Sequence, residues 1–148
     1  MSFHEKSTAA MLAGIIIVYS WYFSKMRAVA STTHVEEGVV AIATIASLLA
    51  ITVAMLVAIA IVAHIAIAIY EQTTTGDVDD TMDERDQLIE LKSEHRSSTV
   101  LSVGVLAVLT LMLMNYSMFW TANALLGALV LSSITKCAFK LYYYRFKG

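Results

Sequence analysis

The chain has 148 residues, of which 58% are apolar and 15% are charged, whereas a soluble domain carries about 25% charged residues. The charges avoid three long stretches, residues 7–24, 38–70 and 97–135. Helices with no charged face exclude a soluble globular domain. The net charge of −2, without a basic block, argues against nucleic-acid binding, and the single Cys137 excludes an internal disulfide scaffold.

These stretches predict an all-α integral membrane protein, a four-helix bundle forming a single transmembrane domain over residues 1–148. A span needs about 20 apolar residues. The last stretch would be about 58 Å long as one helix, roughly twice the hydrocarbon thickness, so it predicts two spans joined by a turn at Asn115, Tyr116 and Ser117. The predicted spans are 7–24, 38–62, 97–115 and 118–136.

One sizeable polar segment, residues 71–96, lies between the second and third spans. Residues 72–76 predict a turn. Thr81 and Glu84 fit a capping box, which predicts that a helix starts there, and no breaker separates this helix from the third span. We therefore expect a charged helical extension outside the membrane.

The distribution of Lys and Arg predicts the topology. With four spans, both termini and residues 71–96 share one side, and this side holds eight of the ten basic residues, leaving Lys25 and Arg27 on the other. The positive-inside rule then predicts both termini in the cytoplasm. The tail alternates aromatic and basic side chains, which predicts contact with the lipid interface by Tyr142, Tyr143, Tyr144, Arg145 and Lys147.

Small residues recur at every fourth position in the predicted spans. Such stripes let helix backbones approach closely in lipid, where no hydrophobic drive favours helix association. They predict helix packing, either inside one bundle or along an oligomer seam. The residues are Ala46, Ala50, Ala54 and Ala58 in the second span and Ala124, Ala128 and Ser132 in the fourth.

The polar segment separates its charges by helical face. Asp86, Glu90 and Glu94 continue an acidic stripe, whereas neither Arg85 nor Lys92 has a carboxylate three or four residues away. The segment can be a solvated helix face, a metal site or a face that docks another molecule. The candidate docking residues are Asp83, Arg85, Asp86, Ile89, Glu90, Lys92 and Arg96.

The run from Asp83 through Glu84, Arg85 and Asp86 to Ile89 resembles the Asp-Glu-Arg-Asp-x-x-Ile element of small uncharacterised prokaryotic four-span membrane proteins. The resemblance covers about 15 residues and the number of spans. It implies a protein of the prokaryotic cytoplasmic (inner) membrane and brings no activity with it.

His64 is the one ionisable group within an apolar span, and such a residue is a functional candidate by default. If the second and third spans pair as a hairpin, His64 and His95 could together ligate a b-type haem or a metal. Hydrogen bonding of His64 at the membrane interface is the simpler interpretation. We therefore expect no cofactor.

No nucleophile–base pair, glycine-rich phosphate loop or buried carboxylate pair is visible, so we expect a non-enzyme. The predicted function is that of an accessory, scaffold or regulatory subunit, acting as a homo-oligomer or within a larger membrane complex. One alternative is an oligomeric channel or carrier lined by Thr44, Ser47, Thr52, Ser102, Thr110 and Asn115. The other is the haem protein that uses His64 and His95.

Overall fold

The computed structural model describes residues 3–32, 39–75 and 84–146, and these residues form four helices. They are α1 (Phe3–Thr32), α2 (Val39–Thr75), α3 (Glu84–Leu113) and α4 (Met118–Phe146). Within the described residues, each of the four is long and apolar enough to cross a membrane. The all-α prediction is confirmed, and the composition fits a multi-pass membrane protein.

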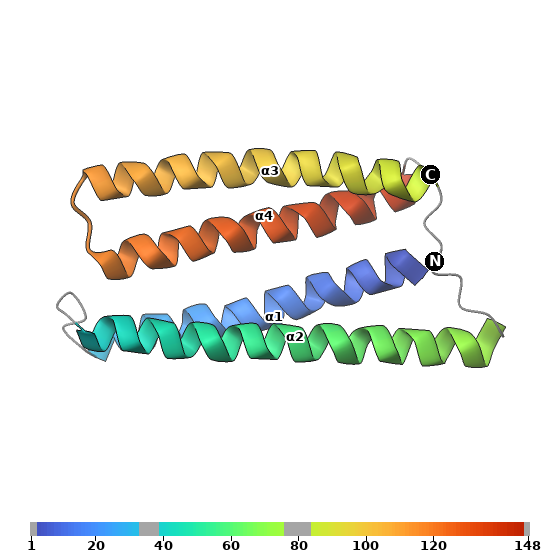
Figure 1. Cartoon of the computed structure of the whole chain (residues 1–148), viewed down its shortest axis with the longest axis horizontal. Helices are drawn as coiled ribbons and strands as arrows, with labels where there is room; N and C mark the ends of the chain where they lie inside the picture. Colours follow the sequence, from blue (N-terminus) through green and yellow to red (C-terminus); the bar gives the residue numbers. More distant parts are fainter. Residues whose placement is uncertain (1–2, 33–38, 76–83, 147–148) are drawn as a thin grey trace.

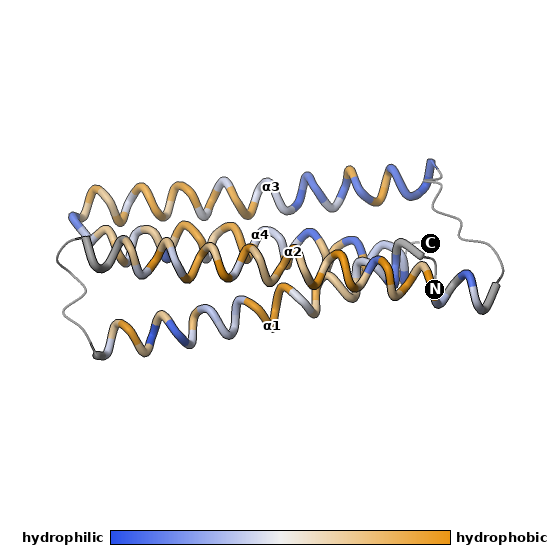
Figure 2. The backbone as a smooth tube through the Cα atoms, turned by 60° about the horizontal axis from the view of Figure 1, so that its bottom comes forward, coloured by the Kyte–Doolittle hydropathy of each residue, from blue (hydrophilic) through white to orange (hydrophobic). Residues whose placement is uncertain are grey.

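The helices lie side by side with alternating directions, in the order α3, α4, α1 and α2 (Figure 1). The starts of α1 and α3 and the ends of α2 and α4 therefore share one end of the molecule, called here the charged end. Figure 2 shows the reason for this name: along α3 the residues change from hydrophilic at this end to mostly hydrophobic at the other.

The arrangement is an open bundle. In the described part of the chain, α3 contacts α4 and neither α1 nor α2, while α1 packs on both α2 and α4. In the most apolar part of α2 and of α3 only 11% of the residues are buried, against 28% in α1. The chain itself therefore leaves long apolar faces of α2 and α3 uncovered.

The hairpin of α3 and α4 turns where the sequence predicts. Asn115 has a left-handed backbone with φ of 57°, a conformation that asparagine tolerates better than most residues. The Tyr116 N–H donates to the Leu111 carbonyl at 3.2 Å and the Asn115 N–H to the Met112 carbonyl at 3.0 Å. These bonds form a Schellman motif, which satisfies the last carbonyls of α3 and reverses the chain.

Small residues hold α3 close to α4. A Cβ added at Gly104 would lie 2.5 Å from the Ala128 Cβ, so only glycine fits there. Nearer the charged end, the Ser132 hydroxyl donates to the Ser97 carbonyl at 2.9 Å. Ala128 and Ser132 are buried and Ala124 is half-buried, so the predicted stripe of the fourth span packs within the chain.

The stripe of the second span faces the other way. Ala46, Ala50, Ala54 and Ala58 are all exposed, because α2 contacts α1 and α4 through its opposite face, which includes the fully buried Thr52. For this stripe, the interpretation as packing inside a single bundle is wrong at the level of one chain.

The end of α2 and the junction between the charged segment and the third span are the two remaining boundaries that the sequence predicts. The predicted turn at residues 72–76 is wrong up to Thr75, because α2 continues to that residue, with the Thr73 hydroxyl donating to the Ile69 carbonyl at 3.0 Å. The charged segment from Glu84 and the third span form one continuous helix. Thr81, the predicted cap, lies outside the described residues.

The glycine contact yields a stability prediction. Gly104→Ala should push α3 from α4 and lower the unfolding free energy by about 1–3 kcal/mol, the usual cost of overpacking. Thermal unfolding in mild detergent measures this effect. Gly127→Ala is the control, since a Cβ there would meet only the Phe23 ring at 4.0 Å. Equal melting temperatures for both variants would contradict the close contact.

Candidate functional site

The charged end holds a cluster of ion pairs between α3 and α4. Lys140 Nζ lies 2.6 Å from Glu90 Oε2, and Lys136 Nζ lies 2.7 Å from Glu90 Oε1. Lys136 also reaches Glu94 Oε2 at 3.4 Å. One carboxylate thus bridges two ammonium groups, and this charged-end cluster (Glu90, Glu94, Lys136 and Lys140) ties the two helices together.

Helical spacing aligns the cluster. Asp86, Glu90 and Glu94 follow one another at four-residue intervals on α3, and so do Lys136, Lys140 and Tyr144 on α4. Residues four apart lie on the same helix face. Because the helices are antiparallel, the acidic stripe meets the basic one, and Ile89 and Ser93 are buried beside it.

The cluster lies beyond the charge-free stretch, and the shifted pKa values at this end include those of Glu90 and of the neighbouring Tyr144. Burial alone would raise the pKa of Glu90, but the hydrogen bonds and charges of Lys136 and Lys140 bring this pKa below its ordinary value. Burial, followed by its interaction with Asp86, holds the pKa of Tyr144 above its ordinary range. Glu90 is therefore a carboxylate at neutral pH and Tyr144 a neutral phenol.

A cavity of about 440 Å³ adjoins the cluster, and side chains from α1, α2, α3 and α4 line it. The lining includes Glu90, Lys136 and Lys140 together with Ser7 of α1 and His64 of α2. Ser7 Oγ lies 3.2 Å from His64 Nε2, and the other ring nitrogen of His64 lies 3.0 Å from the Ala60 carbonyl. His64 is thus hydrogen-bonded at the edge of this cavity.

The structure separates the two histidines proposed for haem. The conditional hairpin of the second and third spans does not form, because α2 and α3 share no contact in the described residues. His64 lines the cavity between the helices, whereas His95 lines a different pocket on the outer side of α3. This arrangement removes the geometric basis for joint ligation by His64 and His95.

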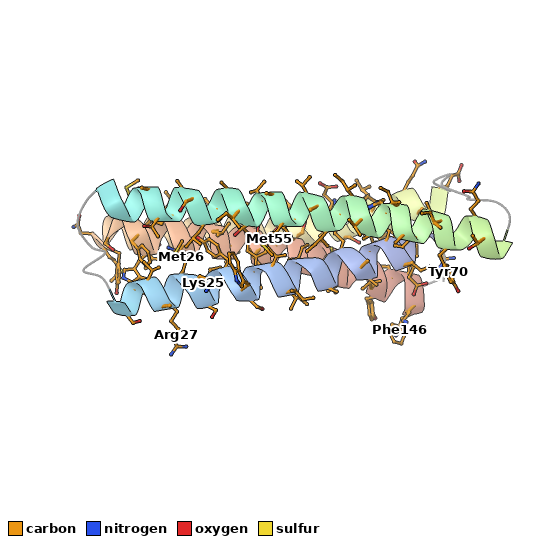
Figure 3. All side chains as sticks on the ribbon, turned by 90° about the horizontal axis from the view of Figure 1, so that it is seen from below. Lys25, Met26, Arg27, Met55, Tyr70 and Phe146 are labelled. Atoms are coloured by element: carbon orange, nitrogen blue, oxygen red, sulfur yellow. The ribbon has the colours of Figure 1, made fainter. Side chains whose placement is uncertain are left out.

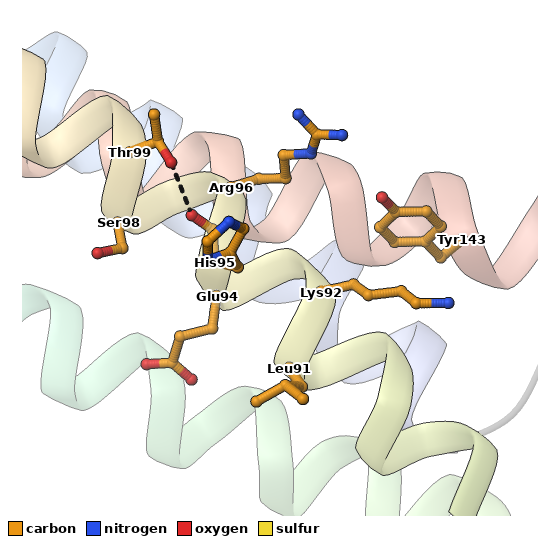
Figure 4. A pocket seen from close by; sticks show the side chains of 8 residues that line it. All are labelled: Leu91, Lys92, Glu94, His95, Arg96, Ser98, Thr99 and Tyr143. Atoms are coloured by element: carbon orange, nitrogen blue, oxygen red, sulfur yellow. Dashed lines mark hydrogen bonds between the residues drawn. The ribbon is translucent and has the colours of Figure 1, made fainter.

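The second pocket, called here the α3 groove, has a volume of about 860 Å³ and lies along the outer face of α3 beside α4 (Figure 4). In Figure 4, Lys92 and Arg96 extend toward the side of Tyr143, and the Thr99 hydroxyl donates to the His95 carbonyl at 3.1 Å. The Arg96 guanidinium lies 6.0 Å from the centre of the Phe139 ring.

The candidate docking residues divide into two groups. Asp86, Ile89 and Glu90 face α4 of the same chain, so their neighbours come from within the molecule. Arg85, Lys92 and Arg96 are exposed, and in the described part of the chain Lys92 forms no ion pair. Asp83 lies outside the described residues.

The predicted interface residues lie at the charged end, at the last turns of α4. Tyr142 is 47% exposed and Arg145 is exposed, with its Nε 3.9 Å from Glu5 Oε1, while Tyr143 and Tyr144 are half-buried. Figure 3 shows Tyr70 and Phe146 at this end and Lys25 and Arg27 at the opposite end. Lys147 lies outside the described residues.

The polar residues suggested for a pore do not line a common path within the chain. Hydroxyls of Ser47, Thr52, Ser102 and Thr110 each donate to a carbonyl three or four residues earlier in their own helix. Ser102 and Thr110 lie on exposed parts of α3, while Thr52 is buried.

The partners of the acidic stripe are Lys136 and Lys140, which were not predicted from the sequence. The sequence contains the signal, since Lys136 and Lys140 have the same four-residue spacing as the acidic residues and lie on the other side of the predicted turn at Asn115.

Comparisons with family models, with curated proteins and with solved structures found no match for this chain.

The ion cluster yields a mutational prediction. Glu90→Gln removes the bridging charge and leaves two lysines facing a neutral amide, which should cost about 1–2 kcal/mol of unfolding free energy for these partly buried ion pairs. Glu94→Gln is the matched control, because Glu94 makes a single longer contact and its side chain is 63% exposed. Thermal unfolding should rank Glu90→Gln well below Glu94→Gln, and the reverse order would refute the bridging role.

The lowered pKa of Glu90 also predicts an acid dependence. The ion pairs contribute fully above the ordinary glutamate pKa of about 4.3, and this contribution is lost as pH falls through the lower native value. Melting temperatures measured from pH 7 to pH 3 should fall less steeply at the acid end for Glu90→Gln than for the unaltered chain. Parallel curves would show that Glu90 has no lowered pKa.

Proposed function

We propose that this chain is a non-enzymatic accessory or scaffold subunit that works by associating with a second copy of itself in the membrane. The exposed α2 stripe of Ala46, Ala50, Ala54 and Ala58 carries the proposal. It lies opposite the α2 face that packs on α1 and α4, so it is free for a contact between chains.

The composition of this face supports the contact. In lipid, helices associate through close backbone approach, which small residues permit, and through interhelical hydrogen bonds. Four alanines in line give a flat strip about 18 Å long, taking 1.5 Å per residue over residues 46–58. An identical strip fits against it, because a two-fold interface places the same surface patch on both subunits.

The proposed setting is the inner membrane of a prokaryote, with both termini in the cytoplasm. The excess of Lys and Arg at the charged end supports this orientation, since Lys25 and Arg27 are the only ones of the described Lys and Arg residues that lie at the opposite end. The resemblance of residues 83–89 to prokaryotic four-span proteins supports the location.

The oligomeric state in mild detergent tests this function. We expect the unaltered chain to be a dimer by light scattering with detergent correction, and Ala50→Leu with Ala54→Leu to shift it to a monomer by blocking backbone approach. Ile16→Leu with Ile17→Leu, at exposed positions of α1, is the control and should leave the dimer intact. A monomeric unaltered chain, or a dimer that survives both alanine changes, would overturn the proposal.

A further inference from the structure

The α3 groove brings two cations to the place where a membrane changes from hydrocarbon to headgroups. Residues 97–113 of α3 carry no charge and span about 26 Å as a helix, close to the hydrocarbon thickness of about 30 Å. Arg96 is the last charge before this stretch, and Lys92 lies one turn, about 6 Å, farther out. Both side chains therefore reach the depth of lipid phosphates.

Lys92 and Arg96 remain available because the nearby carboxylates of Glu90 and Glu94 are already paired with other lysines. Lys136 and Lys140 are paired with Glu90 and Glu94 between α3 and α4. Lys92 has no ion pair among the described residues, and Arg96 contacts the face of the Phe139 ring, which leaves its N–H groups free to donate. The groove thus presents the charges of Lys92 and Arg96 on one side of α3, while Glu94, the one carboxylate that also lines it, points away from them and contacts Lys136.

The apolar surface of α3 next to the groove suits the acyl chains of a lipid. The exposed Val103 and Leu106 continue the outer face of α3 away from the charged end, and they are 62% and 64% exposed. Tyr143 forms the opposite wall of the groove, as Figure 4 shows, and tyrosine prefers headgroup depth. An acyl chain can therefore run along α3 while its headgroup lies between Lys92 and Arg96.

We propose that the α3 groove binds the phosphodiester of an anionic phospholipid. The phosphate oxygens accept hydrogen bonds from the Lys92 ammonium and the Arg96 guanidinium, and the acyl chains cover the apolar outer face of α3. Arg96 supplies a planar pair of donors and Lys92 a point charge, two common ways in which proteins hold phosphate.

Native mass spectrometry of the full chain in mild detergent tests the site. Titration with phosphatidylglycerol and with phosphatidylcholine of identical acyl chains should show a preference of about tenfold for the anionic lipid. Lys92→Gln with Arg96→Gln should abolish this preference. Lys25→Gln with Arg27→Gln, which removes the same charge at the opposite end, should retain it. An equal preference in all three proteins, or none in the unaltered chain, would overturn the proposal and leave the groove to a protein partner.

Two further experiments distinguish lipid binding from binding of free phosphate, and loss of the site from loss of the fold. Inorganic phosphate and glycerophosphoglycerol at the same concentrations should not displace the lipid, and displacement would show a site for the headgroup alone, against the proposal. Lys92→Gln alone breaks no ion pair and should lower the preference about threefold. Lys92→Arg with Arg96→Lys should keep most of it. An unchanged preference in the single variant would overturn the role of Lys92.

Discussion

Helices that are apolar enough to cross a membrane, as α3 and α4 are, face one constraint in pairing: a bilayer gives them no hydrophobic reason to leave lipid for one another. The chain meets this constraint at two levels. In the apolar part, Gly104 lets the backbones approach until Ala128 fills the gap. At the charged end, Glu90 bridges Lys136 and Lys140. Since α3 contacts no helix besides α4 in the described residues, these two ties and the hydrogen bond from Ser132 to the Ser97 carbonyl determine where α3 lies.

The same ion pairs decide which charges are left for other molecules. A charge pair 4 Å apart is worth about 1 kcal/mol in water and several times that at the effective dielectric of a protein surface. Lys136 and Lys140 are therefore held by Glu90 and are poor ligands for anything outside. Lys92 and Arg96 are on the other side of α3 and escape this neutralisation. The predicted docking helix thus uses its acidic face within the chain and keeps part of its basic face for the exterior.

Much of the fold follows from the sequence because span formation is local. Charge-free stretches of sufficient length define the apolar helices, and Asn115 marks the turn. The pairing of Glu90 with Lys140 was also within reach, since each lies 25 residues from Asn115 in an antiparallel hairpin. Which way the α2 stripe faces could not be predicted, because a row of alanines has the same sequence pattern whether its neighbour is α1 or another chain. The separation of His64 from His95 likewise depends on which helices pair, and hydropathy carries no such information.

The open arrangement keeps the two proposed contacts independent. The α2 stripe and the α3 groove belong to helices that do not touch in the described part of the molecule, so occupying one does not require moving the other. A closed bundle would pack α2 against α3 and bury part of both surfaces. With α3 on the outer side of α4, one face of the molecule offers alanines for close helix contact and another offers the exposed cations Lys92 and Arg96. The chemistry of the two faces differs because small apolar residues suit a helix surrounded by lipid tails, whereas Lys92 and Arg96 need phosphate or water.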